Sequence, residues 1–392
     1  MSAQQKPPAI NKRRIRLGMV GGGEGAFIGA VHRLAARMDD HYEFVAGALS
    51  STPEKSRRSG AALNLDEARV YDDFASMAKA EAARPDGIEA VSIVTPNHMH
   101  KAPILTFLKA GIDVICDKPL TISLDDALEI EDAVKASKLV FALTHNYSAY
   151  PLVRQARAMV QAGDLGAVRL VHVEYPQDWL CTPQETSGNK QAEWRTDPAR
   201  SGAGGCIGDI GTHAFQLADF ITNLPLEELA ADLSSFSPGR RVDDNVQIML
   251  RYQNGARGML WASQVAPGHD NGLKIRVYGE KGSLEWMQAQ PNSLQVARLG
   301  APIQIYARGG AGLGAGAALG SRLPPGHPEG YLEAFGNLYS EAAVAIRARR
   351  MGQARPADLL VPGIDDAVKG MAFIDAALTS SKNNAGWVKP RR

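Results

Sequence analysis

The chain has 392 residues, of which 45% are hydrophobic and 22% are charged, the composition of an ordinary soluble globular protein large enough for two domains. Its 43 Lys and Arg residues balance 42 Asp and Glu residues, so charge gives no reason to expect a nucleic acid or a membrane as partner. Cys116, Cys181 and Cys206 lack metal-site spacing and are too few for a disulfide framework. We therefore expect no metal and a cytoplasmic protein.

The first residues are polar and end in the basic run Lys12, Arg13 and Arg14. They contain no apolar stretch of the kind found in a signal peptide or a membrane helix. We expect a disordered tail over residues 1–13.

Residues 14–34 (RIRLGMVGGGEGAFIGAVHRL) pass from an apolar run through a glycine cluster to apolar residues at helical spacing. Strand, glycine turn and helix open a dinucleotide-binding unit, because a backbone without Cβ lets a pyrophosphate approach the helix N-terminus. No Gly-Lys-Ser/Thr follows, which excludes a P-loop. The cluster can be counted as Gly21-x-Gly23-x-x-Ala26, or with Gly25-Ala26-Phe27 as an insertion and Gly29 as the third glycine.

A second strand is expected over residues 42–49, and Ser50 and Ser51 follow where an NAD-binding unit usually has an acidic residue. Lys55, Arg57 and Arg58 lie close by. The missing acid and these cations could admit the 2′-phosphate of NADP, or the cations could form a solvated helix face. The choice between NAD and NADP therefore stays open at this point.

Further apolar strands alternate with helical patterns, which predicts a doubly wound parallel sheet over residues 14–147. Ligand-binding groups should lie at the carboxyl ends of these strands. Two such ends carry polar clusters, Thr95-Pro96-Asn97-His98 and Cys116-Asp117-Lys118-Pro119. The expected strands are 88–94, 112–115 and 139–144, and the expected helices are 103–110 and 124–136.

Residues 148–392 have a different pattern, with several consecutive strands that no helix separates. This predicts an α+β domain with a large, mostly antiparallel open sheet, whose free face would pair with a second subunit in a homodimer or homotetramer. The segment 177–205 is predicted to be an irregular binding loop, and the Gly/Ala-rich segment 309–320 a mobile surface loop. The expected strands are 168–175, 229–236, 245–252, 256–264, 273–278 and 282–287, and the expected helices are 151–162, a segment ending at 221, 331–349 and 364–380.

Three features could carry chemistry, and each also has a purely structural interpretation. Lys118 follows a strand end. It could donate a hydrogen bond to a ligand hydroxyl, it could be an amine whose pKa is lowered by burial, or it could be part of a surface turn. Asp209 and His213 are four residues apart and would share a helix face. His213 could be a general base that Asp209 orients, or Asp209 could cap the helix while His213 packs in the core. The stretch from His327 to Tyr331 combines a histidine and a carboxylate, or simply starts a helix at a proline.

Taken together, these motifs resemble the Gfo/Idh/MocA family, named for glucose–fructose oxidoreductase and inositol dehydrogenase. The matching stretches, over residues 14–388, are VGGGEGAFIGAVH, AVSIVTPNHMH, GIDVICDKPL, WRTDPARSGAGG and GDIGTHAFQLADF. The departures are the glycine-loop insertion, Asp117 where the family usually has glutamate, and Ser50 where an acidic residue is common.

The resemblance implies an oxidoreductase that transfers a hydride between a secondary hydroxyl of a sugar, glycoside or cyclitol and the nicotinamide of NAD, slightly favoured, or NADP. His213 would be the base, Lys118 would hydrogen-bond the same oxygen, and Asp209 would orient the substrate or His213. The implied cofactor-binding residues are Gly21, Gly23, Glu24, Ala26, Phe27, Ile28, Ser50, Ser51, Lys55, Thr95, Pro96, Asn97, His100, Asp117, Lys118 and Asn146. The implied substrate-binding residues are Lys118, Tyr147, Trp179, Trp194, Arg195, Asp209, Thr212, His213, His327 and Tyr331.

Two other functions are compatible with the same fold. An NAD-dependent glycosidase would oxidise C3 transiently and eliminate the aglycone, without net formation of NADH. A non-catalytic dinucleotide sensor would bind the cofactor without turnover, although the retained Lys, Asp and His residues argue against it. A methyltransferase fits least, because it has no use for Lys118 and His213 together.

Overall fold

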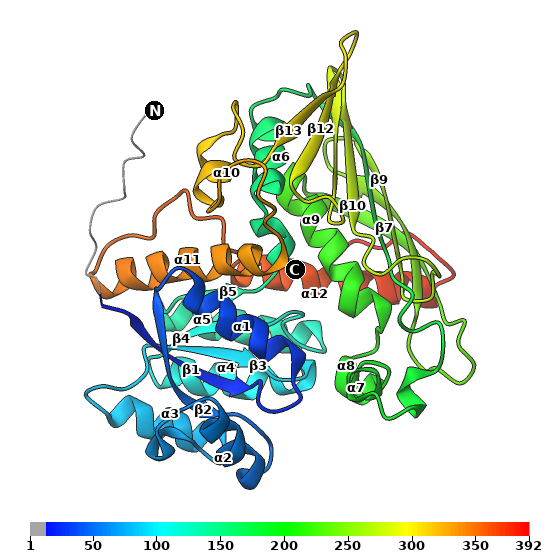
Figure 1. The fold of residues 1–392 in the computed structure, drawn as a ribbon. Helices are drawn as coiled ribbons and strands as arrows, with labels where there is room; N and C mark the ends of the chain where they lie inside the picture. The colour runs from blue at the N-terminus through cyan, green and yellow to red at the C-terminus, as the bar shows by residue number, and fades with distance from the viewer. Residues whose placement is uncertain (1–12, 392) are drawn as a thin grey trace.

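The computed structural model describes residues 13–391, which form two sheets with helices packed around them (Figure 1). The first sheet is parallel, with strand order β2-β1-β3-β4-β5. The predicted doubly wound sheet is therefore confirmed. Its strands are β1 (Ile15–Gly21), β2 (Tyr42–Ala48), β3 (Ala90–Val94), β4 (Asp113–Cys116) and β5 (Phe141–Leu143), and the helices between them are α1 (Phe27–Met38), α2 (Pro53–Ala62), α3 (Phe74–Ala83), α4 (Lys101–Lys109) and α5 (Leu124–Ser137).

The second sheet has eight strands in the order β13-β12-β11-β10-β6-β9-β8-β7. All neighbouring pairs are antiparallel except β6 and β9, as expected for a mostly antiparallel open sheet. Its strands are β6 (Val168–Pro176), β7 (Leu226–Ser234), β8 (Asn245–Tyr252), β9 (Arg257–Ser263), β10 (Lys274–Gly279), β11 (Gly282–Met287), β12 (Ser293–Arg298) and β13 (Gln304–Ala307).

Helices α6 (Pro151–Gln161) and α9 (Thr212–Thr222) pack on the inner face of this sheet. Buried and exposed residues alternate along β8 and β9, so each strand turns one row of side chains to the helices and the other outward. Met249 and Met259 face each other across the two strands on the outer face and are 52% and 59% exposed. The sheet therefore has one covered and one open face.

The last two helices return to the parallel sheet. Helix α11 (Tyr331–Arg350) packs against α1, and α12 (Ile364–Lys382) packs against α5 and β7 (Figure 1). Buried Tyr339 of α11 accepts a hydrogen bond from Tyr42 at its main-chain oxygen, and its hydroxyl is bonded to Ser92 and His32. These contacts hold α11 to the parallel sheet and to α1. The predicted boundary at residue 147 stays a prediction.

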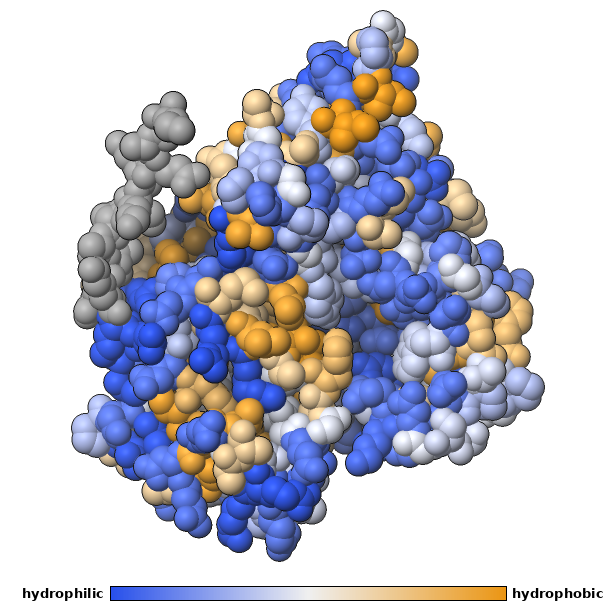
Figure 2. Space-filling view, viewed as in Figure 1, coloured by the Kyte–Doolittle hydropathy of each residue, from blue (hydrophilic) through white to orange (hydrophobic). Residues whose placement is uncertain are grey.

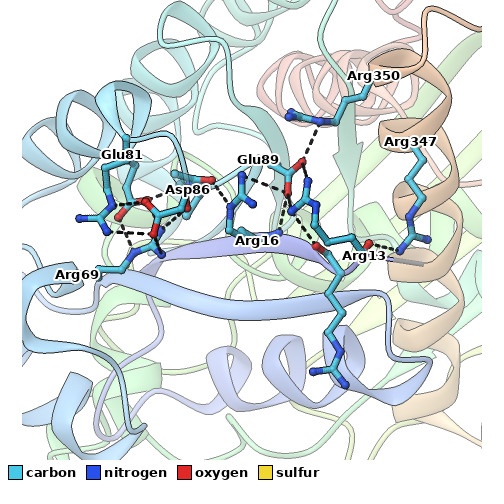
Figure 3. A network of polar contacts seen from close by, with 12 residues as sticks. Arg13, Arg16, Arg69, Glu81, Asp86, Glu89, Arg347 and Arg350 are labelled. Carbon is cyan, nitrogen blue, oxygen red and sulfur yellow. Dashed lines mark hydrogen bonds and ion pairs between the residues drawn. The ribbon is translucent and has the colours of Figure 1, made fainter. Parts of the chain in front are cut away.

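A second link lies at the amino-terminal edge of the parallel sheet, around buried Glu89 (Figure 3). Its carboxylate accepts hydrogen bonds from Arg13 at 2.7 Å and pairs with Arg350 of α11 at 2.9 Å. Arg347, one helical turn before Arg350, donates to the main-chain oxygen of Arg13. Burial alone would raise the pKa of Glu89, but the arginines lower it below its usual value. The network therefore holds α11 to the sheet through ionised groups.

Several local predictions need revision. The segment 177–205 contains the short helices α7 (Lys190–Arg195) and α8 (Pro198–Ser201), and segment 309–320 contains α10 (Ala315–Leu319). Strands β12 and β13 and helices α2 and α3 were not predicted. The tail expected over residues 1–13 lies, up to residue 12, outside the described residues. Within the described range, no helix is long and apolar enough to cross a lipid bilayer.

Candidate functional site

The glycine turn joins β1 to α1 with a backbone conformation and a close approach that favour glycine. Gly21 and Gly22 have φ angles of +80° and +72°, which side chains rarely allow. A Cβ on Gly29 would lie 2.3 Å from the Cα of Gly22, so the helix approaches the strand closely because both are glycine. This supports counting Gly29 as the third glycine. The N-cap of α1, Ala26, has no side-chain capping bond, which leaves the first N–H groups of the helix for an anion.

Gly23 has a second reason to be glycine. A Cβ there would lie 2.6 Å from both the main-chain oxygen of Leu49 and the hydroxyl of Ser59. The Gly23 N–H donates to that same Leu49 oxygen at 3.1 Å. A side chain at this position would therefore disturb the packing of the turn on α2 in addition to any ligand.

The end of β2 carries the groups expected near the adenosine ribose. Ser50 is half-buried, and Ser51 is exposed. Two nearby arginines are already paired, Arg57 with Asp72 at 2.9 Å and Arg58 with Glu24 of the glycine loop at 2.8 Å. Lys55 forms no ion pair with any described residue. The positive charge available for a 2′-phosphate is therefore smaller than the sequence indicates.

A cavity of about 410 Å³ opens between the carboxyl edge of the parallel sheet and the second sheet. In Figure 2, a hollow lies between the region of α1, where hydrophobic residues gather, and the α7–α8 side of the molecule, which is mostly hydrophilic. The residues predicted from the sequence that line the cavity are Phe27, Ile28, Asp117, Lys118, Asn146, Tyr147, Arg195, Asp209, His213 and Tyr331.

Lys118 and Asp209 meet in this cavity although they are 91 residues apart. The Lys118 ammonium donates to the main-chain oxygen of Asp209 at 2.6 Å and to its Oδ1 at 3.1 Å. Arg195 of α7 lies 3.4 Å from the same Oδ1, and Gln264 donates to Oδ2 at 2.9 Å. Burial would raise the pKa of Asp209, but Lys118 and Arg195 outweigh it and lower the pKa to about 2. The carboxylate is therefore ionised at neutral pH.

The helix that carries Asp209 and His213 differs from the expected one. Residues Ile207–Gly211 form a π-helical turn, and the regular helix α9 begins only at Thr212. Such turns are frequent at functional sites. Both side chains line the cavity, but among the described residues Asp209 makes no hydrogen bond to His213. The resemblance implied that Asp209 orients either the substrate or His213. In the structure its carboxylate instead contacts Lys118.

His213 is almost fully buried, and its Nδ1 has no hydrogen-bond partner among the described residues. Its ring packs against the edges of Tyr147 and His145, with centroids 4.9 Å and 5.4 Å away. Burial, together with the charge of Lys118, lowers the pKa of His213 well below its usual value. The imidazole is therefore neutral at neutral pH and can accept a proton.

Asp117 is held on the other wall of the cavity. Thr144 donates to its carboxylate at 2.9 Å, and His32 of α1 lies 3.9 Å away. Burial opposes ionisation, but His32 and Lys118 lower the pKa of Asp117 below its usual value. The hydrogen bond from Thr144 thus holds the Asp117 carboxylate, and His32 of α1 acts on it only electrostatically.

Several cavity residues were not found from the sequence. Tyr175 shares a 2.5 Å hydrogen bond with Tyr147 and donates to Asn271 at 2.6 Å, and Gln177 donates to the same Asn271 oxygen at 2.8 Å. Such amides and phenols come from different strands and loops, so no local pattern in the sequence marks them. The remaining polar lining consists of Thr144, Gln191 and Gln288.

Other predicted residues do not line the cavity. His100 is fully buried, and its ring nitrogens are bonded to main-chain oxygens of Thr95, Pro119 and Leu120. His327 is exposed on the segment before α11, Thr212 is buried in α9, and the half-buried rings of Trp179 and Trp194 lie outside the lining, with Trp194 stacked on Arg195 at 4.2 Å. The residues Thr95, Pro96 and Asn97 follow β3 beside Gly21, with Asn97 bonded to Ser201.

Comparison with known proteins identifies this arrangement. A model of the oxidoreductase family with an NAD-binding Rossmann fold matches residues 15–145, and a model of the GFO/IDH/MocA C-terminal domain matches residues 153–285. The chain belongs to the Gfo/Idh/MocA family. The resemblance inferred from the sequence is thus confirmed, and with it the expectation of a dinucleotide-dependent dehydrogenase.

Solved structures of this family extend over nearly the whole chain. An oxidoreductase from Sinorhizobium meliloti is 55% identical, with 96% of this chain and 100% of that chain covered and a TM-score of 0.88. An inositol dehydrogenase homologue from Azotobacter vinelandii, solved with NADH and myo-inositol, is 36% identical, with coverages of 96% and 98% and a TM-score of 0.90. Levoglucosan dehydrogenase from Pseudarthrobacter phenanthrenivorans is 28% identical over 96% of this chain and 98% of its own.

Proposed function

We propose that this Gfo/Idh/MocA protein transfers a hydride between a secondary hydroxyl of a sugar or cyclitol and the nicotinamide of NAD. One observation carries the proposal. Lys118 of the cofactor domain meets Asp209 and His213 of the second domain in a single cavity, beside a glycine turn shaped for a dinucleotide. A base, a cation and a carboxylate beside a nicotinamide are the groups that oxidation of an alcohol requires. The relatives solved or named with myo-inositol and levoglucosan support this substrate class.

The protein groups divide the proton chemistry among them. A bound nicotinamide would supply the hydride acceptor at its C4. His213 takes the hydroxyl proton, because burial and the charge of Lys118 lower its pKa and leave the imidazole uncharged before the reaction. Lys118 donates a hydrogen bond to the same oxygen and stabilises its alkoxide character. Asp209 holds the Lys118 ammonium in place and contacts the substrate.

The cofactor preference is proposed to be NAD. Arg57 and Arg58 are occupied by Asp72 and Glu24, so Lys55 is the nearby cation left for a 2′-phosphate. Relatives solved with NADH support the same choice. The residues proposed to hold the ribose are Ser50 and Ser51.

A panel of neutral sugars, glycosides and inositols with NAD and NADP tests the function through the absorbance of the reduced cofactor and the identity of the product. For a substrate that the native enzyme accepts, His213→Ala should lower kcat by about 10²–10⁴-fold. NAD affinity, measured by calorimetry, should stay near normal. Release of aglycone without net NADH would instead identify the glycosidase reaction. Binding of NAD without turnover of any member of the panel would point to a sensor.

The open face of the second sheet is proposed to pair with another copy of the chain. Met249 and Met259 lie opposite each other there, and Leu170 on β6 adds a third exposed apolar side chain on the same face. Light scattering should show a homodimer or homotetramer. Met259→Glu should shift it to smaller species, whereas Leu319→Glu, at an exposed site on α10, should not.

A further inference from the structure

We infer that the substrate is an uncharged polyol, and that the cavity rejects the phosphorylated and carboxylated forms of the same sugars. The inference rests on the proposed function and narrows it to one chemical class. Its basis is the placement of charge and of amide groups around the cavity.

Both cations of the cavity, Lys118 and Arg195, are already paired with the carboxylate of Asp209. The ammonium of Lys118 and the guanidinium of Arg195 both face Oδ1 of Asp209, at 3.1 Å and 3.4 Å. Their side chains are only 14% and 25% exposed. Asp117 contributes a second carboxylate, held by Thr144. A phosphate entering here would meet two cations and two carboxylates instead of an unpaired positive patch.

Arg195 is also constrained on its other sides. Its guanidinium stacks on Trp194 and donates to the side chain of Gln191 at 2.5 Å, within the same short helix α7. An anion that bound Arg195 would compete with these contacts and would weaken the interaction that stabilises the buried negative charge of Asp209. Arg195 is therefore placed to hold Asp209 and not to bind an anionic ligand.

The rest of the polar lining suits hydroxyl groups. It includes uncharged groups, the amides of Asn271, Gln177 and Gln288 and the phenol of Tyr175, and the Asn271 oxygen already accepts hydrogen bonds from Tyr175 and Gln177. A hydroxyl can exchange hydrogen bonds with such uncharged groups, whereas they bring no positive charge to compensate a phosphate or a carboxylate. Neutral polyols satisfy such a surface because each hydroxyl both donates and accepts.

Paired substrates test the selectivity at constant ring structure. The neutral myo-inositol is paired with inositol 1-phosphate, and the neutral D-glucose is paired with glucose 6-phosphate and with glucuronate. We expect kcat/KM to be at least about 10²-fold higher for a neutral member than for its anionic counterpart. Comparable or better turnover of an anionic member would overturn the inference while leaving the proposed hydride transfer intact.

A binding experiment decides the inference even if no member of the panel is oxidised. The protein is saturated with NADH, so that the pyrophosphate site is filled, and inorganic phosphate is titrated by calorimetry. Native protein should show no phosphate binding in the millimolar range. Asp209→Asn should bind phosphate about 10- to 100-fold more tightly than native protein, because it leaves Lys118 and Arg195 without their carboxylate.

The matched control is Glu228→Gln, which removes a carboxylate from Arg251 on the outer part of the second sheet. It should bind phosphate as weakly as native protein does. Phosphate binding by native protein in competition with a neutral polyol would contradict the inference. Equal phosphate affinity of native protein and folded Asp209→Asn would contradict it as well.

Discussion

Replacing Lys118 by methionine tests whether this residue both stabilises the cavity and sets the charge state of His213. The variant removes an ammonium that is 14% exposed and lies 3.1 Å from Oδ1 of Asp209. Removing one partner of a fully buried ion pair costs about 3–5 kcal/mol of unfolding free energy. Asp209 keeps Arg195 at 3.4 Å and Gln264 at 2.9 Å, so its remaining charge stays partly compensated. We therefore expect a loss of about 1–3 kcal/mol.

The effect on the reaction should be larger and should depend on pH. Loss of one donor to a developing oxyanion typically lowers kcat by about 10²–10³-fold. Burial, with the charge of Lys118, lowers the pKa of His213, so native kcat/KM should show no acid limb from His213 at pH 6.5 or above. Without the ammonium, the pKa of His213 rises. The acid limb of Lys118→Met should therefore move to higher pH.

The control is Lys369→Met, because Lys369 forms an ion pair with Asp219 at 3.2 Å outside the cavity, with a side chain that is 38% exposed. It should lose less stability than Lys118→Met and should keep both kcat and the pH profile. Steady-state kinetics from pH 5 to 9 and denaturant unfolding measure the two effects. Native turnover in folded Lys118→Met, or an acid limb that moves to lower pH, would refute the reasoning.

Three further outcomes follow from the structure. Ser50→Asp should lower kcat/KM with NADP more than with NAD through like-charge repulsion, whereas Ser50→Ala, which adds no charge, should not; equal effects of the two variants would misplace the ribose site. Glu89→Gln should lower the unfolding free energy at pH 7 by about 1–3 kcal/mol, because its arginine partners are partly exposed. Since the folded state lowers the pKa of Glu89, this difference should shrink as the pH falls through that value, and a constant difference would argue against ionised pairing. Burial and the charge of Lys118 lower the pKa of His145 to about 3. Below about pH 6.5 the unfolded chain binds a proton at His145 that the folded protein does not, so the unfolding free energy of the native protein falls by up to about 1.4 kcal/mol per pH unit. Urea unfolding of His145→Asn should therefore show a weaker pH dependence than that of the native protein.

Much of the fold could be predicted because its signals are local. Apolar runs, the glycine cluster and helical spacing mark β1, α1 and the other elements of the parallel sheet within a few residues of their observed ends. Two of the missed elements, β13 and α2, lack such signals. Strand β13 (Gln304–Ala307) has no fully buried side chain, and α2 contains mostly small and charged residues. Neither segment has the apolar periodicity that a sequence pattern requires.

The candidate site was predictable only in part. Lys118 and His213 stand in motifs, and the structure brings both to one cavity. The spacing of Asp209 and His213 assumed a regular helix, but a π-helical turn directs Asp209 to Lys118 instead. Asn271 lies in the loop before β10, and hydrogen bonds from Tyr175 and Gln177, distant in sequence, hold it at the cavity. His327 is a titratable residue that could serve as a base, but it is exposed and does not line the cavity. Its exposure is set by tertiary packing, which a sequence pattern does not show.

The most direct test of the central claim is to follow a carbon-bound deuterium through a single turnover. A neutral polyol accepted by the enzyme is prepared with deuterium on its hydroxyl-bearing carbons and mixed with NAD and excess enzyme, and the reduced cofactor is analysed by mass spectrometry and NMR. The proposed reaction transfers the deuterium to C4 of the nicotinamide, with loss of this transfer in His213→Ala. Reduced cofactor without deuterium, or undiminished transfer in His213→Ala, would contradict the account.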